Sequence, residues 1–258
     1  MSKIKKIKTF KSKVTLTLED NTKIDVDKNV FPDFYLYVGK NLTKKEIAEI
    51  NKSNDAASLL QYALKLRQKN AYTEYRMREK LYDKGGKKDQ IDIVIKKLKH
   101  SGLINDKKYI EDYIEYYNSL NYGKNKIVSK LMDKGIFKET LDRLVFPKAI
   151  ELKKANKNLK HFENKYSKYN DAQKKQHIYQ AYIADGFDVD IAKEMVNEVK
   201  SNTPSDEKKK LDEDFEKVYR KYRVKYKKKD LRTKLISALA GKGYKINDII
   251  NLIERKHL

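Results

Sequence analysis

Apolar residues recur at helical spacing through most of the chain, and four stretches share one pattern ahead of a glycine. In the first stretch, Met77 and Leu81 stand eight and four residues before Gly85, which places them on one face of a helix. The other three stretches repeat this spacing, at intervals of 50, 51 and 57 residues. The repeat predicts an amphipathic helix before each glycine. The four glycines are Gly85, Gly135, Gly186 and Gly243.

Two further apolar stripes accompany each of these helices. One follows the glycine by nine and ten residues, as at Leu144 and Val145 after Gly135. The other precedes the helix, as at Leu59 and Leu66. Each unit is therefore predicted to hold three helices. Because stacked helical units bury their apolar faces mainly against neighbours, four such units predict a mainly α protein built as an elongated, curved array.

The glycines suit the ends of the predicted helices. Glycine readily adopts the left-handed backbone conformation that often follows the last turn, and basic residues there complement the negative end of the helix dipole. Lys84, Lys134 and Lys242 each stand directly before a turn glycine. At the start of the last unit, Thr203 and Pro204 provide an N-cap and a first-turn proline.

Residues 1–50 follow a different pattern. Apolar and polar residues alternate over 14–18 and again over 24–26, with a turn signal between the two runs. This alternation predicts a small β-hairpin, and residues 4–9 are expected to add a third strand.

A helix is predicted to open at the end of this N-terminal piece, because Thr43 and Glu46 have the spacing of a capping box. The piece is too small to hold a large core of its own, so it is expected to dock on the first helical unit. The predicted segments are a small N-terminal α+β piece over 1–50 and four three-helix repeats over 51–104, 105–155, 156–202 and 203–258.

The charge of the chain indicates a polyanion near the working surface. The 60 Lys and Arg residues outnumber the 37 Asp and Glu residues, and the formal charge of +23 is spread along the length. A lysine-rich composition explains why the bases are lysines, but not why acids fail to balance them. The chain has no cysteine, and no apolar stretch approaches the roughly 18 residues of a membrane span. We therefore expect a soluble, cytoplasmic protein with no membrane partner.

Sequence spacing brings no catalytic or metal-binding groups together. The four histidines share no metal-ligand spacing, and a zinc ribbon needs cysteines that the chain lacks. Gly241 and Lys242 lack the flanking residues of a phosphate-binding P-loop. The sequence thus predicts a protein that is not an enzyme and carries no metal or cofactor. The histidines are His100, His161, His177 and His257.

The basic residues have a register suited to binding. In the first two units, the residues nine, five and one before the glycine are all basic, which forms a stripe along one side of a helix. The third unit breaks the stripe, so a merely solvated face is an open alternative. A second cluster, RKYRVKYKKK at 220–229, contains two tyrosines that suit either base stacking or a helix core, and their spacing favours the core. The candidate partner-binding or DNA-binding residues are Arg76, Lys80, Lys84, Lys126, Lys130, Lys134, Arg220, Arg223, Lys227, Lys234 and Lys242.

With this repeat assembled, the chain resembles the RecX family of bacterial recombinase regulators, and in particular its longer, Gram-positive-type members. The order and spacing of the matching motifs agree over residues 55–258, although the third unit carries little of the signature. The motifs are EKLYDKGGKKDQIDIVIKKLKHSGLINDKKYIEDYI at 79–114, YGKNKIVSKLMDKGIFKETLD at 122–142 and RTKLISALAGKGYKINDIINLI at 232–253.

The resemblance implies a regulatory protein that binds RecA, lying in the helical groove of the RecA filament on single-stranded DNA. There it would inhibit ATP hydrolysis, strand exchange and co-protease activity, and so modulate recombination, DNA repair and the SOS response. We expect it to act as a monomer.

Two other classes of function compete with this interpretation. A direct, non-specific single-stranded nucleic-acid-binding protein would also be basic, but acids such as Asp89 and Asp92 on the helix after the glycine would repel phosphate. A structural scaffold without a DNA role is the other class, and the large positive charge argues against it.

Overall fold

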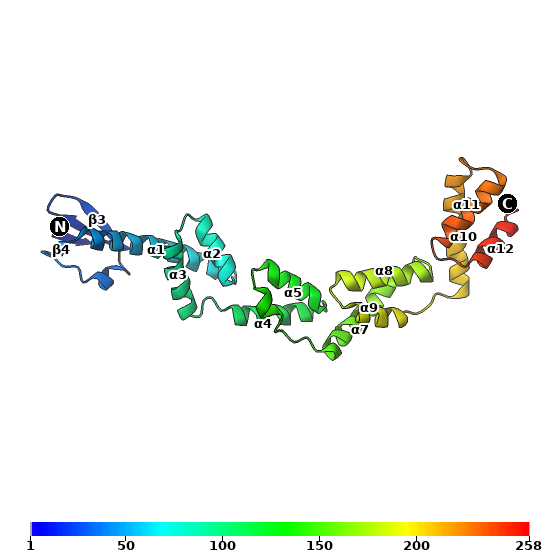
Figure 1. Cartoon of the computed structure of the whole chain (residues 1–258), viewed down its shortest axis with the longest axis horizontal. Helices are drawn as coiled ribbons and strands as arrows, with labels where there is room; N and C mark the ends of the chain where they lie inside the picture. Colours follow the sequence, from blue (N-terminus) through cyan, green and yellow to red (C-terminus); the bar gives the residue numbers. More distant parts are fainter. Residues whose placement is uncertain (1, 258) are drawn as a thin grey trace. The chain divides into compact units, whose positions relative to one another are not determined.

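The computed structural model describes residues 2–257, with the side chains of 228 and 229 excepted. Twelve α-helices and four β-strands lie in this described part of the chain, which confirms the predicted mainly helical fold with an N-terminal strand piece (Figure 1). The chain divides into two compact units, which are described separately. The first comprises Met1–Asp112 with Leu131–Thr140, and the second Tyr113–Lys130 with Leu141–Leu258.

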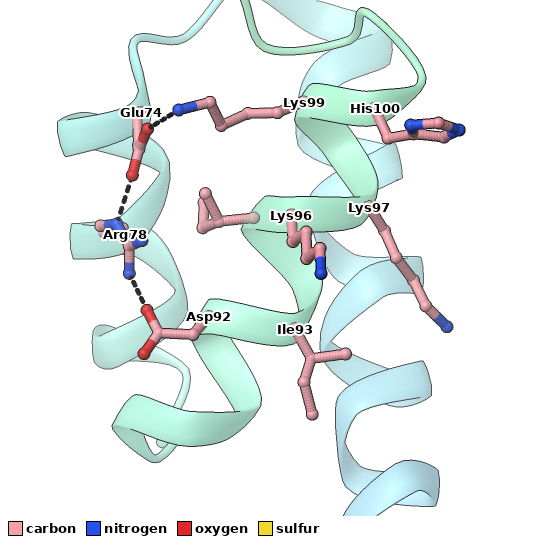
Figure 2. Close-up of a pocket in the computed structure, with 9 residues that line it drawn as sticks. Glu74, Arg78, Asp92, Ile93, Lys96, Lys97, Lys99 and His100 are labelled. Carbon is pink, nitrogen blue, oxygen red and sulfur yellow. Dashed lines mark hydrogen bonds and ion pairs between the residues drawn. The ribbon is translucent and has the colours of Figure 1, made fainter.

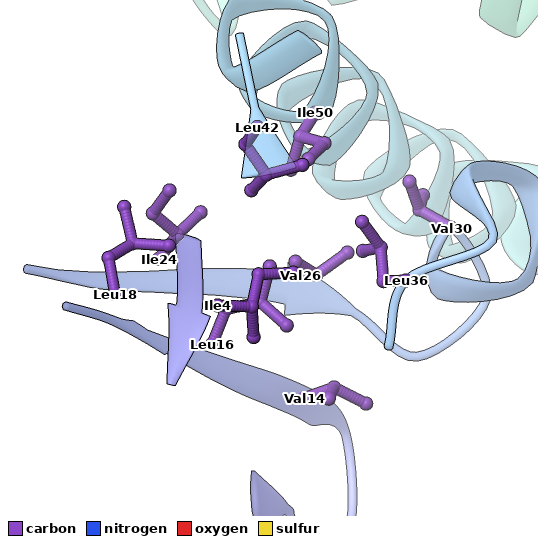
Figure 3. Close-up of a cluster of buried hydrophobic side chains, with 10 residues drawn as sticks. All are labelled: Ile4, Val14, Leu16, Leu18, Ile24, Val26, Val30, Leu36, Leu42 and Ile50. Carbon is purple, nitrogen blue, oxygen red and sulfur yellow. The ribbon is translucent and has the colours of Figure 1, made fainter. Parts of the chain in front are cut away.

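The N-terminal strands form one antiparallel sheet in the order β3-β2-β1-β4. The predicted hairpin and third strand are confirmed, while the two-residue β4 is too short to leave a sequence pattern. Because apolar and polar residues alternate along the strands, one face of the sheet is buried. Figure 3 shows the apolar side chains of this face gathered beside the first turns of the following helix. The strands are β1 Ser2–Thr9, β2 Lys13–Leu18, β3 Lys23–Asp27 and β4 Asn41–Leu42.

The first helix, α1 (Lys44–Lys69), joins this sheet to the helices that follow. Its predicted capping box is present, because Glu46 N–H donates to Thr43 Oγ1 and Thr43 N–H donates to Glu46 Oε2. Ile50 belongs to the core of the sheet, and Asn54 donates to Asp25 O at 2.6 Å. The predicted docking of the N-terminal piece is therefore achieved within one continuous helix.

Two helices complete the core of the first unit around α1: α2 (Glu74–Asp83) and α3 (Lys88–His100). The next three are α4 (Asp106–Ser119), α5 (Lys124–Asp133) and α6 (Lys138–Leu141).

The shortness of α6 corrects one prediction. Leu144 and Val145 lie beyond the end of α6, and Val145 is 85% exposed. Pro147 is the N-cap of the next helix and disfavours the helical conformation at Phe146, so Leu144 and Val145 lie in the connection between the two helices.

Six more helices make up the rest of the second unit, with one buried cluster over the first three and another over the last three. They are α7 (Lys148–Lys165), α8 (Asp171–Ala184), α9 (Val189–Asn197), α10 (Pro204–Tyr222), α11 (Lys228–Ala240) and α12 (Ile246–Arg255). Thr203 is the N-cap of α10, as predicted. Two predicted segment boundaries, after residues 50 and 155, fall inside α1 and α7. The five-segment division stays a prediction.

We call α2, α5, α8 and α11 the middle helices. The apolar residues four and eight positions before their glycines are all completely buried, as the pattern predicts. These residues are Met77, Leu81, Ile127, Leu131, Ile178, Tyr182, Leu235 and Leu239, each 0% exposed.

All four middle helices end in the predicted turn. Gly85, Gly135, Gly186 and Gly243 have φ of 90°, 77°, 85° and 88°. After α2, Gly85 N–H donates to Tyr82 O and Gly86 N–H to Leu81 O, and the other three turns repeat this pair of bonds. This is the Schellman arrangement, which satisfies carbonyl groups that a helix end otherwise leaves open.

Candidate partner-binding surface

The N-terminus of α2 is held by the ends of two other helices in its unit. Thr73 Oγ1 donates a 2.6 Å hydrogen bond to Lys134 O, in the turn after α5. Glu74 N–H, the first of the helix, donates to Asp106 Oδ1 of α4 at 2.8 Å. The open amide groups of one helix are thus satisfied by the carbonyl and carboxylate groups of others.

The same junction occurs twice more, within the second unit. At the N-terminus of α5, Gly123 N–H donates to Asp185 O at 2.8 Å and Lys124 N–H to Glu151 Oε2 at 2.9 Å. A positive helix end meets a negative one each time, which is favourable for the two helix dipoles.

At the N-terminus of α8, Asn170 Nδ2 donates to Lys242 O at 3.0 Å and Asp171 N–H to Glu207 Oε1 at 2.9 Å. Each of the three junctions therefore uses a carbonyl just before a turn glycine and a carboxylate from the first helix of a following set.

Two residues of the predicted basic stripe reach these junctions with their side chains. Arg76 pairs with Glu79 at 2.6 Å and donates to Asp133 O at the end of α5. The hydrogen bond with Glu79 raises the pKa of Arg76. Lys126 pairs with Asp185 at 3.1 Å and lies 3.7 Å from the Tyr122 ring. Both cations therefore fasten helix ends in addition to presenting charge.

Other residues of the stripe are more open. On α2, Lys80 is 3.7 Å from Asp83, and Lys84 lies over the Tyr62 ring. On α5, Lys130 is exposed, while Lys134 is half-buried in the turn that receives Thr73. The structure thus places Arg76, Lys126 and Lys134 at the junctions, whereas Lys80, Lys84 and Lys130 are more open to solvent.

The basic residues near the C-terminus surround the core of α10 to α12. Arg220, Arg223 and Lys227 are exposed. Tyr222 and Tyr226 pack against the buried cluster, so the core interpretation of these tyrosines is confirmed.

Lys234 and Lys242 are the two predicted residues on and after α11. Lys234 lies over the Tyr226 ring, and Lys242 pairs with Asp214 at 3.3 Å. Lys242 is therefore tied to α10, whereas Lys234 is exposed.

A groove of about 860 Å³ between α2 and α3 contains a charge network that sequence spacing did not reveal (Figure 2). Arg78 bridges Glu74 and Asp92, and Lys99 also binds Glu74. Burial raises the pKa of Glu74, but its hydrogen bonds with Lys99 and Arg78 outweigh burial and leave the pKa lowered.

The groove also has a basic rim. Lys96, Lys97 and His100 line it, and Lys97 and His100 point away from the charge network. The acidic residues of the groove are paired with cations. The additional basic residues of the rim therefore give the groove an excess of positive charge.

The described residues lack two other features that would indicate a different kind of protein. Among the described residues, no group of His, Cys, Asp and Glu has the arrangement of a metal site. No helix in the described chain is long and apolar enough to cross a membrane.

These features define the class of the protein: a basic, helix-rich chain whose helices join through a recurring junction and present charged surfaces. No protein-family model matches the chain. A regulatory protein RecX from Streptococcus sanguinis is 30% identical over 97% of this chain and 98% of its own. A regulatory protein RecX from Listeria monocytogenes is 26% identical over 93% of this chain and 90% of its own.

Solved structures agree with these relatives. A crystal structure of a regulatory protein RecX, at 22% identity, matches with a TM-score of 0.66 over 76% of this chain and all of that one. The crystal structure of RecX from Lactobacillus salivarius, at 25% identity, matches with a TM-score of 0.52 over 57% of this chain and 97% of that one. The chain belongs to the RecX family of regulatory proteins.

Proposed function

We propose that this chain binds RecA and the RecA filament on single-stranded DNA, lies in the helical groove of the filament, and inhibits ATP hydrolysis, strand exchange and co-protease activity. It acts in the cytoplasm as a monomer and by binding, not by catalysis. The observation that carries the proposal is the relationship to a regulatory protein RecX over 97% of the chain.

The recurring junctions support binding to a partner that itself repeats. Each junction holds a short middle helix in place, and the more open lysines beside it, such as Lys80 and Lys130, face solvent. Several weak contacts on one chain add through multivalency when the partner offers several copies of its site. A filament is such a partner, whereas a free RecA subunit is not.

The excess positive charge supports a partner that contains nucleic acid. A formal charge of +23 favours association with a nucleoprotein assembly and raises its rate of formation. Phosphate contacts of this kind add affinity without reading the base sequence.

The proposal is tested by comparing three targets: RecA alone, naked oligo(dT), and RecA assembled on oligo(dT) with a non-hydrolysable ATP analogue. Binding to each is measured by fluorescence anisotropy at about 50 mM and about 200 mM salt. We expect the filament to bind most tightly at both salt concentrations, and the chain to slow the ATPase of RecA. Absence of filament binding, or an unchanged ATPase at saturating protein, would reject the proposal.

Direct single-stranded nucleic-acid binding is the second candidate, and the exposed Arg220, Arg223 and Lys227 favour it. A protein held by six to ten phosphate contacts loses roughly 10³–10⁵-fold in affinity over that rise in salt. Binding to naked oligo(dT) as tight as to the filament, with this steep loss, would identify the second candidate.

A further inference from the structure

The turn after α2 is the one turn of the four that carries no docked helix in the described chain. A Cβ atom added at Gly135 would overlap Tyr75, and one added at Gly243 would overlap Ala172, because the N-terminus of another middle helix covers each turn. At Gly186 the covering residue is Lys126. At Gly85 no atom lies within 4 Å of the added Cβ.

The hydrogen bonds show the same difference between the turn after α2 and the other three turns. The carbonyl groups of Lys134, Asp185 and Lys242 each accept a bond from the N-cap residue of another middle helix. The equivalent carbonyl of Lys84 has no hydrogen-bond partner among the described residues. The turn after α2 has the same backbone bonds as the other three, so it offers the same acceptor, which no described residue binds.

We infer that this turn, residues 82–86, is a docking site for the N-terminus of a helix from a partner protein. The inference rests on the proposed function, since it adds a contact to the surface that binds RecA. The three covered turns show what the site accepts. It takes a helix whose N-cap residue donates one hydrogen bond to the carbonyl before the glycine, and whose first turn lies over the glycine itself.

The charges beside the turn indicate which kind of partner helix the site favours. Asp83 is near Lys80 at 3.7 Å and Asp89 pairs with Lys52 at 2.6 Å, so the acids beside the turn are compensated. Lys84, Lys87 and Lys88 are exposed and have no acidic partner among the described residues. The site therefore favours a helix with Asp or Glu in its first turn, where acids also suit the helix dipole.

A second copy of this chain suits the site poorly. Among the middle helices, only α11 has an N-terminus that covers no turn in the described chain; its first turn holds Asp230, but it directly follows the exposed Lys225 and Lys227. These lysines would meet Lys84, and like charges in contact repel. The partner is accordingly a different protein.

A photo-cross-linking amino acid at position 82 tests the docking directly, and position 132 is its matched control. Tyr82 and Met132 both stand three residues before a turn glycine and are 49% and 51% exposed, but only the turn after Met132 is covered. We expect position 82, and not position 132, to cross-link to RecA in filaments on oligo(dT). Equal cross-linking from both positions, none from position 82 while the chain still binds the filament, or cross-linking between two copies without RecA would overturn the inference.

A substitution at the glycine gives an independent test. Gly85→Asn places a side chain over the open turn, and asparagine tolerates a positive φ better than most residues. Gly102→Asn is the control, because Gly102 also has a positive φ and open space around it. With both variants folded by circular dichroism, we expect Gly85→Asn to weaken filament binding roughly tenfold and Gly102→Asn to leave it unchanged. Unchanged binding by Gly85→Asn would reject the docking site and leave the proposed function standing, whereas failure of the wild-type chain to bind RecA would reject both.

Discussion

The hydroxyl group of Thr73 donates a 2.6 Å hydrogen bond to the backbone carbonyl of Lys134, 61 residues further along the chain. The same oxygen accepts a bond from Arg76 N–H at 3.2 Å, and Thr73 is only 1% exposed. One side chain thus caps its own helix and fastens it to the end of another. Gly123 and Asn170 occupy the same position in the other two junctions.

Replacing Thr73 by valine is expected to destabilise the protein by about 1–3 kcal/mol, because valine keeps the shape of threonine but loses the cap and leaves a partly buried carbonyl without its partner. Thr73→Ser keeps the hydroxyl group and is the control. Urea unfolding followed by circular dichroism measures both. Equal stability of the valine and serine variants would show that the hydrogen bonds contribute nothing.

Replacing the turn glycines by alanine is expected to cost more stability at the covered turns than at the open turn after α2. All of these positions have a positive φ, so each substitution carries a common strain of roughly 1–2 kcal/mol. At Gly135 and Gly243 the new methyl group also overlaps Tyr75 or Ala172, which adds about 1–3 kcal/mol. Gly85→Ala should show the strain alone. A loss at Gly85 as large as at Gly135, measured by the same unfolding assay, would contradict the junction geometry.

The parts of the fold that depend on local spacing were predictable from the sequence. The buried positions of the middle helices follow from a period of 3.6 residues, and the turn glycines from their place after a helix. The Thr43 and Thr203 caps follow from residues only three positions apart. Each of these signals lies within one helix or its ends.

The contacts between helices were not predictable, because they join residues that no local period relates. Glu151 looks like an ordinary surface acid of a helix, yet it caps Lys124 N–H from 27 residues away. For the same reason, the sequence pattern of the stripe did not distinguish Arg76 from Lys80, although of the two only Arg76 donates a hydrogen bond to Asp133 O. The helix α6 ends at Leu141, so the apolar positions at 144 and 145 lie in the connection before Pro147 and not on a helix.

The buried pair of Glu151 and Lys154 offers a third prediction. Their charged atoms are 2.5 Å apart, both side chains are almost fully buried, and Lys154 Nζ also donates to Asn118 Oδ1 and Tyr122 O. Lys154→Met should destabilise the protein by about 3–5 kcal/mol, because it leaves a buried carboxylate without its counter-charge.

The double variant Glu151→Gln, Lys154→Met removes both charges and should recover part of that loss, since glutamine can still accept the bond from Lys124 N–H. Unfolding of the two single variants and the double variant completes the cycle. Strict additivity of the losses would show that the two charges do not interact.

The stability of the first unit is expected to depend on the ionisation of Glu74. Its pKa is lowered by hydrogen bonds with Lys99 and Arg78 against the effect of burial. A group with a lowered pKa stabilises the fold fully above its ordinary pKa, and that contribution is lost as the pH falls through the lowered value. Glu74→Gln should therefore melt below the wild type at neutral pH, and the gap should close in acid.

Melting temperatures of both proteins from about pH 7 to about pH 3 test this dependence. Burial raises the pKa of the neighbouring Asp106, so its own contribution has the opposite sign and decreases as the pH rises. Glu49→Gln is the control, because Glu49 is exposed and has no charged partner among the described residues. A gap for Glu74→Gln that stays constant with pH would exclude ionisation of this carboxyl as its cause.

Charge reversal at the more open lysines of the stripe should affect regulation without affecting folding. Lys80 and Lys130 are exposed enough that Lys80→Glu and Lys130→Glu should change the melting temperature little, since surface ion pairs contribute under about 1 kcal/mol. Both variants should inhibit the RecA ATPase less well, whereas Lys160→Glu, an equal charge change on α7, should inhibit as the wild type does. Lys126→Glu should instead lower the melting temperature, because it replaces the partner of Asp185 with a like charge. Inhibition by Lys80→Glu and Lys130→Glu equal to that of Lys160→Glu would remove both lysines from the binding surface, since all three variants carry the same net charge.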